Sequence, residues 1–229
     1  MKISVLAYHK VDDYYYSENW ITINKFKEHL EIIKKYNYTP LFLDDIYKNN
    51  LLDNSIVITF DDGYENFYTK AYPILKEYNF KATNFISTNF ISYNENTRHY
   101  NTEWEKNKIE INFPVKHLIW EEIQLMKDDG FKFECHTKSH SDLTMLSLND
   151  IETEIAISKK IIEKNLQEPV YFFSAPYARY NKDVENVILK YGFHGAVKSS
   201  KYKFSTKNII GINRIAMNMN TNVEELFKT

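Results

Sequence analysis

Short apolar runs alternate with segments that repeat apolar residues at helical spacing, and this alternation limits the possible folds more than any other feature of the chain. Ile3–Tyr8 and Ser55–Phe60 are rich in β-branched and aromatic residues, whereas Phe26, Leu30 and Ile33 between them recur at the spacing of one helix face. Strand, helix and strand in this order are typical of parallel strands joined by helical crossovers. The sequence therefore predicts an α/β fold with a parallel sheet.

The alternation continues to the end of the chain. Ser147 and Asp150 resemble a helix-capping pair, and Gly130 is suited to end a helix. Residues 88–116 are polar and weakly patterned, which indicates an active-site loop or an insertion that holds at most a short hairpin. Further helices are expected over Tyr64–Tyr78, Trp120–Asp129, Ser147–Leu166 and Lys182–Tyr191, and further strands over Thr83–Ile86, Phe131–Cys135, Val170–Phe173 and Gly195–Val197.

Length, charge and cysteine content limit the number of domains, the kinds of partner and the disulfides of this chain. The 229 residues contain no Pro/Gly/Ser-rich linker, so a single domain over residues 1–229 is expected. The 29 Lys and Arg nearly balance the 31 Asp and Glu, and this balance gives no electrostatic reason to expect nucleic acid or an anionic membrane surface as a partner. Cys135 is the only cysteine and cannot form an intramolecular disulfide.

The N-terminal segment predicts a strand instead of an export signal. Its apolar run is short and is interrupted by His9 and Lys10, and no small-residue cleavage site follows. No stretch of the chain approaches the roughly 18 uninterrupted apolar residues of a membrane span. A cytoplasmic location is the expectation, although a secreted or cell-envelope protein with a truncated N-terminus would have the same sequence.

Polar residues gather where three of the expected strands end. Asp61 and Asp62 follow one strand, His136 and His140 follow another, and Ser174–Tyr177 follow a third. In a barrel of parallel strands these ends share one rim, where (β/α) barrels assemble their sites. We therefore expect the three clusters to converge.

Each cluster also has a structural interpretation. Successive aspartates favour helix starts, where they complement the helix dipole, and three other Asp–Asp pairs occur in the chain. His136 and His140 could be separate surface residues, and no Glu follows His136 as in the HExxH zinc motif. Two imidazoles and one carboxylate would leave open positions on a hydrolytic metal. Cys135 next to His136 has no further His and Asn/Asp partners that would indicate a cysteine nucleophile.

The motifs together resemble a known family. Thr59-Phe-Asp-Asp-Gly63 followed by His136-Thr-Lys-Ser-His140 is similar to the polysaccharide deacetylase family, also called the NodB-homology or carbohydrate esterase family 4. Tyr8–Val11, Trp120 and Ser174–Tyr177 resemble its poly-N-acetylglucosamine deacetylase subgroup. The resemblance implies a NodB-type distorted (β/α) barrel of about seven parallel strands, and a hydrolase that removes N-acetyl groups from a sugar or polysaccharide.

The resemblance also implies residue roles. Asp61 would be the general base, and Asp62, His136 and His140 would bind a divalent metal, usually zinc. Pro176 and Tyr177 would contact the substrate, with the Tyr177 backbone N–H stabilising the oxyanion. The partner would be an N-acetylated carbohydrate. The native metal, the particular acetylated substrate and the oligomeric state are not predicted.

The chain departs from the family pattern in two places. The late Leu-x-His motif that supplies the general acid is missing and His194 is not in that context, so His9 is the candidate, with a core histidine as the alternative. Ser174 stands where many members have an arginine that orients the catalytic aspartate, and serine is too short for that role. Arg214 is the candidate replacement, with a surface strand residue as its alternative. An amidohydrolase of a non-sugar amide and a catalytically silent carbohydrate-binding barrel remain alternative functions.

Overall fold

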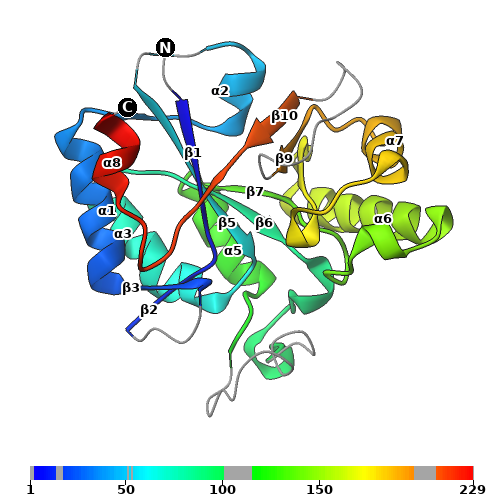
Figure 1. The fold of residues 1–229 in the computed structure, drawn as a ribbon. Coiled ribbons are helices and arrows are strands. Elements are labelled where there is room, and N and C mark those ends of the chain that lie inside the picture. The colour runs from blue at the N-terminus through cyan, green and yellow to red at the C-terminus, as the bar shows by residue number, and fades with distance from the viewer. Residues whose placement is uncertain are drawn as a thin grey trace.

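The computed structural model describes residues 3–13, 18–50, 52, 54–100, 115–198 and 210–228. Its centre is a sheet of parallel strands in the order β10-β9-β8-β7-β6-β5-β1-β11. The strands of this path are β1 (Ile3–Tyr8), β5 (Ser55–Asp62), β6 (Thr83–Ile86), β7 (Lys132–Cys135), β8 (Phe172–Ser174), β9 (Gly195–Lys198), β10 (Ile210–Asn213) and β11 (Ile215–Ala216). Figure 1 shows the strands surrounded by helices.

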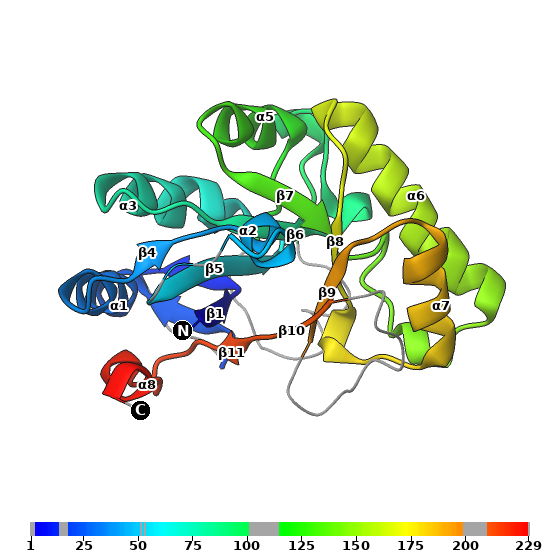
Figure 2. The ribbon, with the colours of Figure 1, turned by 90° about the horizontal axis from the view of Figure 1, so that it is seen from above.

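The last two strands nearly close this sheet into a barrel. β10 pairs with β9 at one edge, β11 pairs with β1 at the other, and only Arg214 separates them in the chain. They therefore form one bent strand that reaches from edge to edge, which Figure 2 shows from above. Counted in this way, the barrel has seven strands, and the prediction of a distorted parallel barrel is confirmed.

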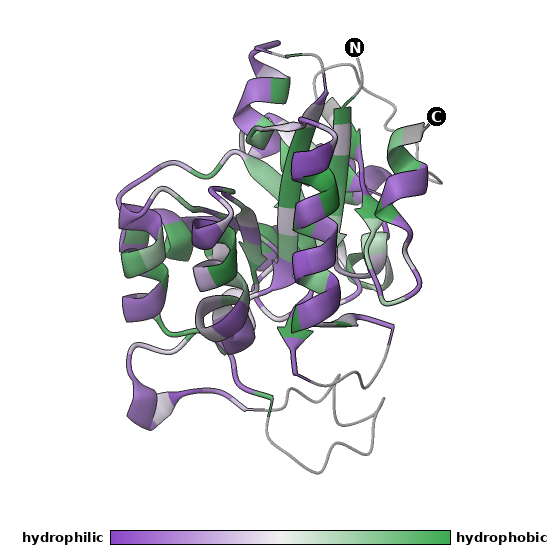
Figure 3. Ribbon diagram, turned by 90° about the vertical axis from the view of Figure 1, so that its left-hand side faces the viewer, coloured by the Kyte–Doolittle hydropathy of each residue, from purple (hydrophilic) through white to green (hydrophobic). Residues whose placement is uncertain are grey.

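Helices cover the outside of the barrel and pack apolar side chains against it. They are α1 (Ile23–Lys35), α3 (Tyr72–Glu77), α5 (Trp120–Asp128), α6 (Leu148–Leu166) and α7 (Lys182–Lys190), with α8 (Val223–Lys228) packed beside α1. Figure 3 shows hydrophobic colour concentrated on the strands and hydrophilic colour on the outer sides of the helices. The predicted helix start at Ser147 is confirmed, because its side chain caps α6 by accepting a hydrogen bond from the Asp150 N–H.

A smaller apolar cluster fills the barrel itself. Its members are Val5, Val57, Phe85, Phe172, Val197 and Ile212 from six strands, and Leu43 from the short helix α2 (Leu43–Tyr47). Residues two apart on a strand share a face. Residues two and four positions after a member of this cluster, toward the carboxyl end of the strand, therefore also face the inside of the barrel. On β5 this places Thr59 and Asp61 above Val57. The interior is therefore a packed core with polar residues at one end.

Several short elements were not predicted. β2 (Lys10–Asp12) and β3 (Trp20–Thr22) form a separate two-stranded sheet, and β4 (Thr39–Pro40) pairs with the start of β5. Two 3₁₀ turns, η2 (Thr88–Phe90) and η3 (Glu95–Thr97), follow β6, and η4 (Leu143–Met145) and η5 (Pro176–Ala178) lie near the predicted site motifs. Within the predicted loop or insertion over residues 88–116, Tyr100 forms an antiparallel bridge with Lys116, and residues 101–114, where a short hairpin was one possibility, lie outside the described residues.

The helix expected over Tyr64–Tyr78 differs from the prediction. It contains a π-helical turn, η1 (Phe67–Ala71), before α3 begins at Tyr72. Pro73 in the first turn of α3 has no N–H to donate, and the Tyr72 N–H bonds back to the Phe67 carbonyl, five residues earlier. None of the described helices is both long and apolar enough to cross a membrane.

A buried histidine on α1 is expected to make stability depend on pH. The His29 side chain is fully buried, its Nδ1 lies 3.1 Å from the Tyr8 hydroxyl, and burial, together with nearby Lys25, lowers its pKa to about 4. The unfolded chain takes up this proton near pH 6.5, so stability present at pH 7 is lost as pH falls from about 6.5 toward 4. Urea unfolding should show that the free energy of unfolding falls by about 2 kcal/mol between pH 7 and pH 5 because of this group.

Substituting His29 separates its part of the pH dependence of stability from that of other groups. His29→Gln should reduce the pH-dependent loss by that amount, whereas His99→Gln, at an exposed histidine, should leave it unchanged. Equal pH slopes for wild type and His29→Gln would contradict the assignment.

Candidate active site

The polar residues at the strand ends converge on one cavity of about 260 Å³ at the carboxyl end of the barrel. Its wall contains Asp61 and Asp62 from β5 and His136 and His140 from the segment after β7. The other lining residues are Ala7, His9, Asn19, Ala175, Tyr177, Ala178, Lys198, Arg214 and Ala216. The cavity thus brings together all the predicted site residues except Pro176, which is buried between Ala175 and Tyr177.

An unusual backbone lets two consecutive aspartates face the same cavity. Successive residues of a regular strand point to opposite faces, but Asp62 has a φ of +78° and turns back toward the side of Asp61. Gly63 follows with a φ of +74°, and a β-carbon there would lie 3.0 Å from Ile91 Cδ1. Asp61 and Asp62 still pair with Phe85 and Ile86 of β6, so β5 extends two residues beyond the predicted strand, and Gly63 accommodates the turn that follows.

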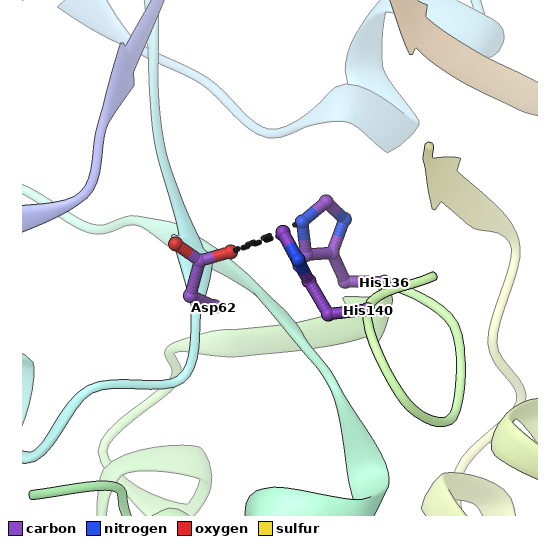
Figure 4. Close-up of side chains that lie close together, drawn as sticks. All are labelled: Asp62, His136 and His140. Carbon is purple, nitrogen blue, oxygen red and sulfur yellow. Dashed lines mark ion pairs between the residues drawn. The ribbon is translucent and has the colours of Figure 1, made fainter. Parts of the chain in front are cut away.

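Asp62, His136 and His140 form a tight cluster (Figure 4). Asp62 Oδ1 lies 3.2 Å from His136 Nε2 and 3.1 Å from His140 Nε2. Although burial favours its neutral form, the two imidazoles, when protonated, hold the pKa of Asp62 well below its ordinary value. Neither carboxylate oxygen makes a hydrogen bond within the described residues, although both are buried. A buried carboxylate in this state requires a cation.

The donor atoms of the cluster fit a divalent metal. His136 Nδ1 lies 2.7 Å from the Ser174 carbonyl oxygen, which can only accept, so Nδ1 carries a proton, and in the neutral imidazole that binds a metal the Nε2 lone pair faces Asp62. The three ligand atoms lie within 4.8 Å of one another. Two imidazole nitrogens and one carboxylate oxygen, with the second nitrogen of a ligand held by a carbonyl, are typical of catalytic zinc sites.

The segment between the two histidines has a strained conformation. Thr137 and His140 have φ values of +68° and +60°, which for side-chain-bearing residues costs on the order of 1–3 kcal/mol each. Within the segment, Thr137 Oγ1 accepts a hydrogen bond from the His140 N–H at 3.0 Å, and Ser87 Oγ donates to the His136 carbonyl at 2.7 Å. The turn brings both imidazoles to the same side.

Asp61 is held by a guanidinium. Arg214 Nη1 and Nη2 donate to the two carboxylate oxygens of Asp61 at 2.7 and 2.6 Å, a bidentate pair inside the barrel. Burial opposes ionisation of Asp61, but Arg214 outweighs it and holds the pKa of this carboxyl below its ordinary value. Arg214 occupies the bend between β10 and β11, so the closure of the barrel places it here.

Ser174 contributes more than we expected. Its Oγ donates to Asp61 Oδ2 at 3.3 Å and accepts from Arg214 Nη2 at 3.1 Å. Its carbonyl also accepts the His136 Nδ1–H. Serine was expected to be too short to orient the aspartate as an arginine would; it reaches Asp61 with one hydrogen bond, whereas the bidentate contact comes from Arg214.

His9 and Tyr177 lie on the wall of the cavity. Burial lowers the pKa of His9, although the Asp62 and Asp61 carboxylates oppose this effect. Tyr177 has a φ of +59°, and its ring lies 5.1 Å from that of His140. Its side chain is 42% exposed, which leaves part of the ring available to a ligand.

Comparison with known proteins agrees with this geometry. Residues 48–196 match the family described as polysaccharide deacetylase. The chain belongs to the polysaccharide deacetylase family. YxkH of Bacillus subtilis (strain 168) is 29% identical over 205 residues, which cover 86% of this chain and 64% of YxkH. The poly-beta-1,6-N-acetyl-D-glucosamine N-deacetylase of Staphylococcus aureus (strain MSSA476) is 28% identical over 194 residues, which cover 76% of this chain and 60% of that protein.

Solved structures show the same fold. The Streptococcus pyogenes deacetylase PplD in complex with acetate superposes with a TM-score of 0.82 at 26% identity, covering 100% of this chain and 98% of PplD. A de-N-acetylase from Aggregatibacter actinomycetemcomitans has a TM-score of 0.79 at 18% identity, covering 98% of this chain and 99% of that one. The resemblance inferred from the sequence motifs is confirmed. The curated relatives YxkH and the S. aureus protein are longer, and this chain spans less than two thirds of each.

Some residues of this deacetylase-family site carry no motif signal. Lys198 ends β9 and Asn19 precedes β3, and both line the cavity. Glu154 on α6 contacts the segment between the metal-ligand candidates. Only the packing of distant segments brings these residues to the site, so a search for local patterns could not identify them.

Proposed function

We propose that this chain is a metal-dependent hydrolase that removes N-acetyl groups from an N-acetylated sugar or polysaccharide, with zinc as the metal. The observation that carries the proposal is the combination in one cavity of an Arg214-bound Asp61 carboxylate with the Asp62, His136 and His140 cluster. Two relatives of the chain support it. One removes N-acetyl groups from poly-N-acetylglucosamine, and another deacetylase structure holds acetate.

The chemistry divides among the residues by position. A bound zinc ion supplies a Lewis acid that polarises an amide carbonyl and acidifies water. Asp61, kept ionised by Arg214, accepts the proton of the attacking water. The carbon–nitrogen bond of the acetamide then breaks, and the products are acetate and a free amine on the sugar.

The leaving nitrogen requires a proton, and His9 is our candidate to deliver it. His9 lines the same cavity as Asp61 and follows β1 directly. Tyr177 would contribute its backbone N–H to the oxyanion and its ring face to the sugar. Pro176 is buried, so its part is to hold the η5 turn in place.

Acetate release from N-acetylglucosamine oligomers tests the proposal. Protein treated with chelator and dialysed should release none, and added Zn²⁺ should restore release in proportion to the metal bound. Nα-acetyl amino acids serve as a parallel substrate. Release from these alone would identify an amidohydrolase of non-sugar amides, and zinc binding without release from any substrate would identify a silent barrel.

A further inference from the structure

Glu154 is a buried carboxylate on α6 that holds the segment between the two histidines. Its side chain is 8% exposed overall, yet no lysine or arginine pairs with it within the described part of the chain. Oε2 accepts hydrogen bonds from the backbone N–H groups of Lys138 at 3.0 Å and Ser139 at 2.8 Å. Oε1 accepts from Ser139 Oγ at 2.7 Å. All these contacts are with one short turn.

The same turn is held from a second point on the helix and from the opposite side. Ser158, one turn further along α6, donates its Oγ–H to the Thr137 carbonyl at 2.8 Å. Across the turn, the Asn89 N–H donates to the Lys138 carbonyl at 2.8 Å. Glu154 therefore satisfies two adjacent N–H groups that the left-handed residues Thr137 and His140 leave outside any regular hydrogen-bond ladder.

We propose that Glu154 is a positioning residue for the metal site. Its carboxylate fixes the peptide between His136 and His140, so that both Nε2 atoms face Asp62 before a metal binds. The inference rests on the proposed function, because it takes these three residues as the metal ligands. The position of the accepting oxygen matters more for this role than the charge of the carboxylate, because two N–H groups converge on that single oxygen.

Two conservative variants separate geometry from charge. Glu154→Gln removes the charge but keeps an oxygen that can accept both N–H groups, and its NH₂ can donate to Ser139 Oγ. Glu154→Asp keeps the charge but is one methylene too short to reach the turn. Zinc titration of the metal-free proteins should show a Kd close to wild type for Glu154→Gln and a Kd about 10–100-fold weaker for Glu154→Asp.

A matched control comes from the same helix. Glu163 accepts a hydrogen bond from the Val170 N–H at 3.0 Å. Val170 precedes β8 and so lies at the end of the barrel opposite the cavity. Like Glu154, Glu163 accepts a hydrogen bond from a backbone N–H, and Glu163→Asp shortens this side chain by one methylene at a loop away from the cavity. It should lower the thermal midpoint, through this contact and its ion pair with Lys159, and leave the zinc Kd unchanged.

The outcomes are distinct. An unchanged Kd for Glu154→Asp would overturn this inference alone, as would a Glu154→Gln variant that binds as weakly as Glu154→Asp, because charge would then be the cause. A similar loss of zinc affinity in Glu163→Asp would show that general destabilisation is responsible and would also overturn it. A wild-type protein that binds no zinc would overturn the metal assignment itself.

Discussion

Asp61→Asn is expected to lower kcat for acetate release by about 10²–10⁴-fold, the usual contribution of a general base, and to leave zinc in the site. The amide cannot accept the proton of the attacking water, and it also faces Arg214 with one oxygen instead of two. The zinc content should stay close to wild type, because Asp62 and the two histidines are intact. Steady-state kinetics on N-acetylglucosamine oligomers and metal analysis of the same samples provide the measurement.

Another Asp–Asp pair provides the control. Asp128→Asn changes an exposed carboxylate of another Asp–Asp pair, at the C-terminal end of α5 and outside the lining of the cavity. Its kcat should equal that of wild type. If Asp61→Asn kept kcat within a few-fold of wild type, another group would have to be the base.

His136→Ala is expected to abolish activity by a different route, through loss of the metal. The substitution removes the Nε2 atom that faces Asp62 and the hydrogen bond from Nδ1 to the Ser174 carbonyl. Structural zinc sites with four protein ligands bind with about 10–16 kcal/mol in total, or about 3 kcal/mol per ligand, so loss of one of the three ligands proposed here should weaken zinc binding by roughly 10²-fold or more. Zinc titration of the metal-free protein measures this, and acetate release should fall to that of chelator-treated wild type.

His194→Ala is the matched control for this prediction. His194 stacks between Tyr47 and Tyr171, with centroid distances of 4.2 Å to each, away from the cavity. Its substitution should reduce stability but keep the zinc Kd. The assignment of roles would fail if His136→Ala retained wild-type zinc affinity, or if Asp61→Asn lost it.

Most of the secondary structure could be predicted because it depends on local periodicity. The strands β1, β5, β6, β7 and β9 and the helices α5, α6 and α7 agree with the apolar pattern to within a few residues. The π-helical turn before α3 and the extension of β5 to Asp62 were missed. The first is associated with the proline at position 73, and the second with the pairing of Asp61 and Asp62 with β6, neither of which periodicity describes.

By itself the sequence determined which chemistry-bearing residues follow which strands. Thr59–Gly63 and His136–His140 each come directly after an apolar run, and parallel strands that share one rim then require these segments to meet. The family could be inferred from the same residues, because the motifs are local and specific.

Only the tertiary structure decided what holds these residues in place. Arg214 lies 153 residues from Asp61 in the chain, and it reaches the carboxylate because the strand that contains it bends from β9 to β1 and closes the barrel. Ser174 and Glu154 likewise act through strand spacing and helix packing, neither of which leaves a periodic signal. Local patterns determine the elements, whereas contacts between distant segments depend on how the whole sheet curves and closes.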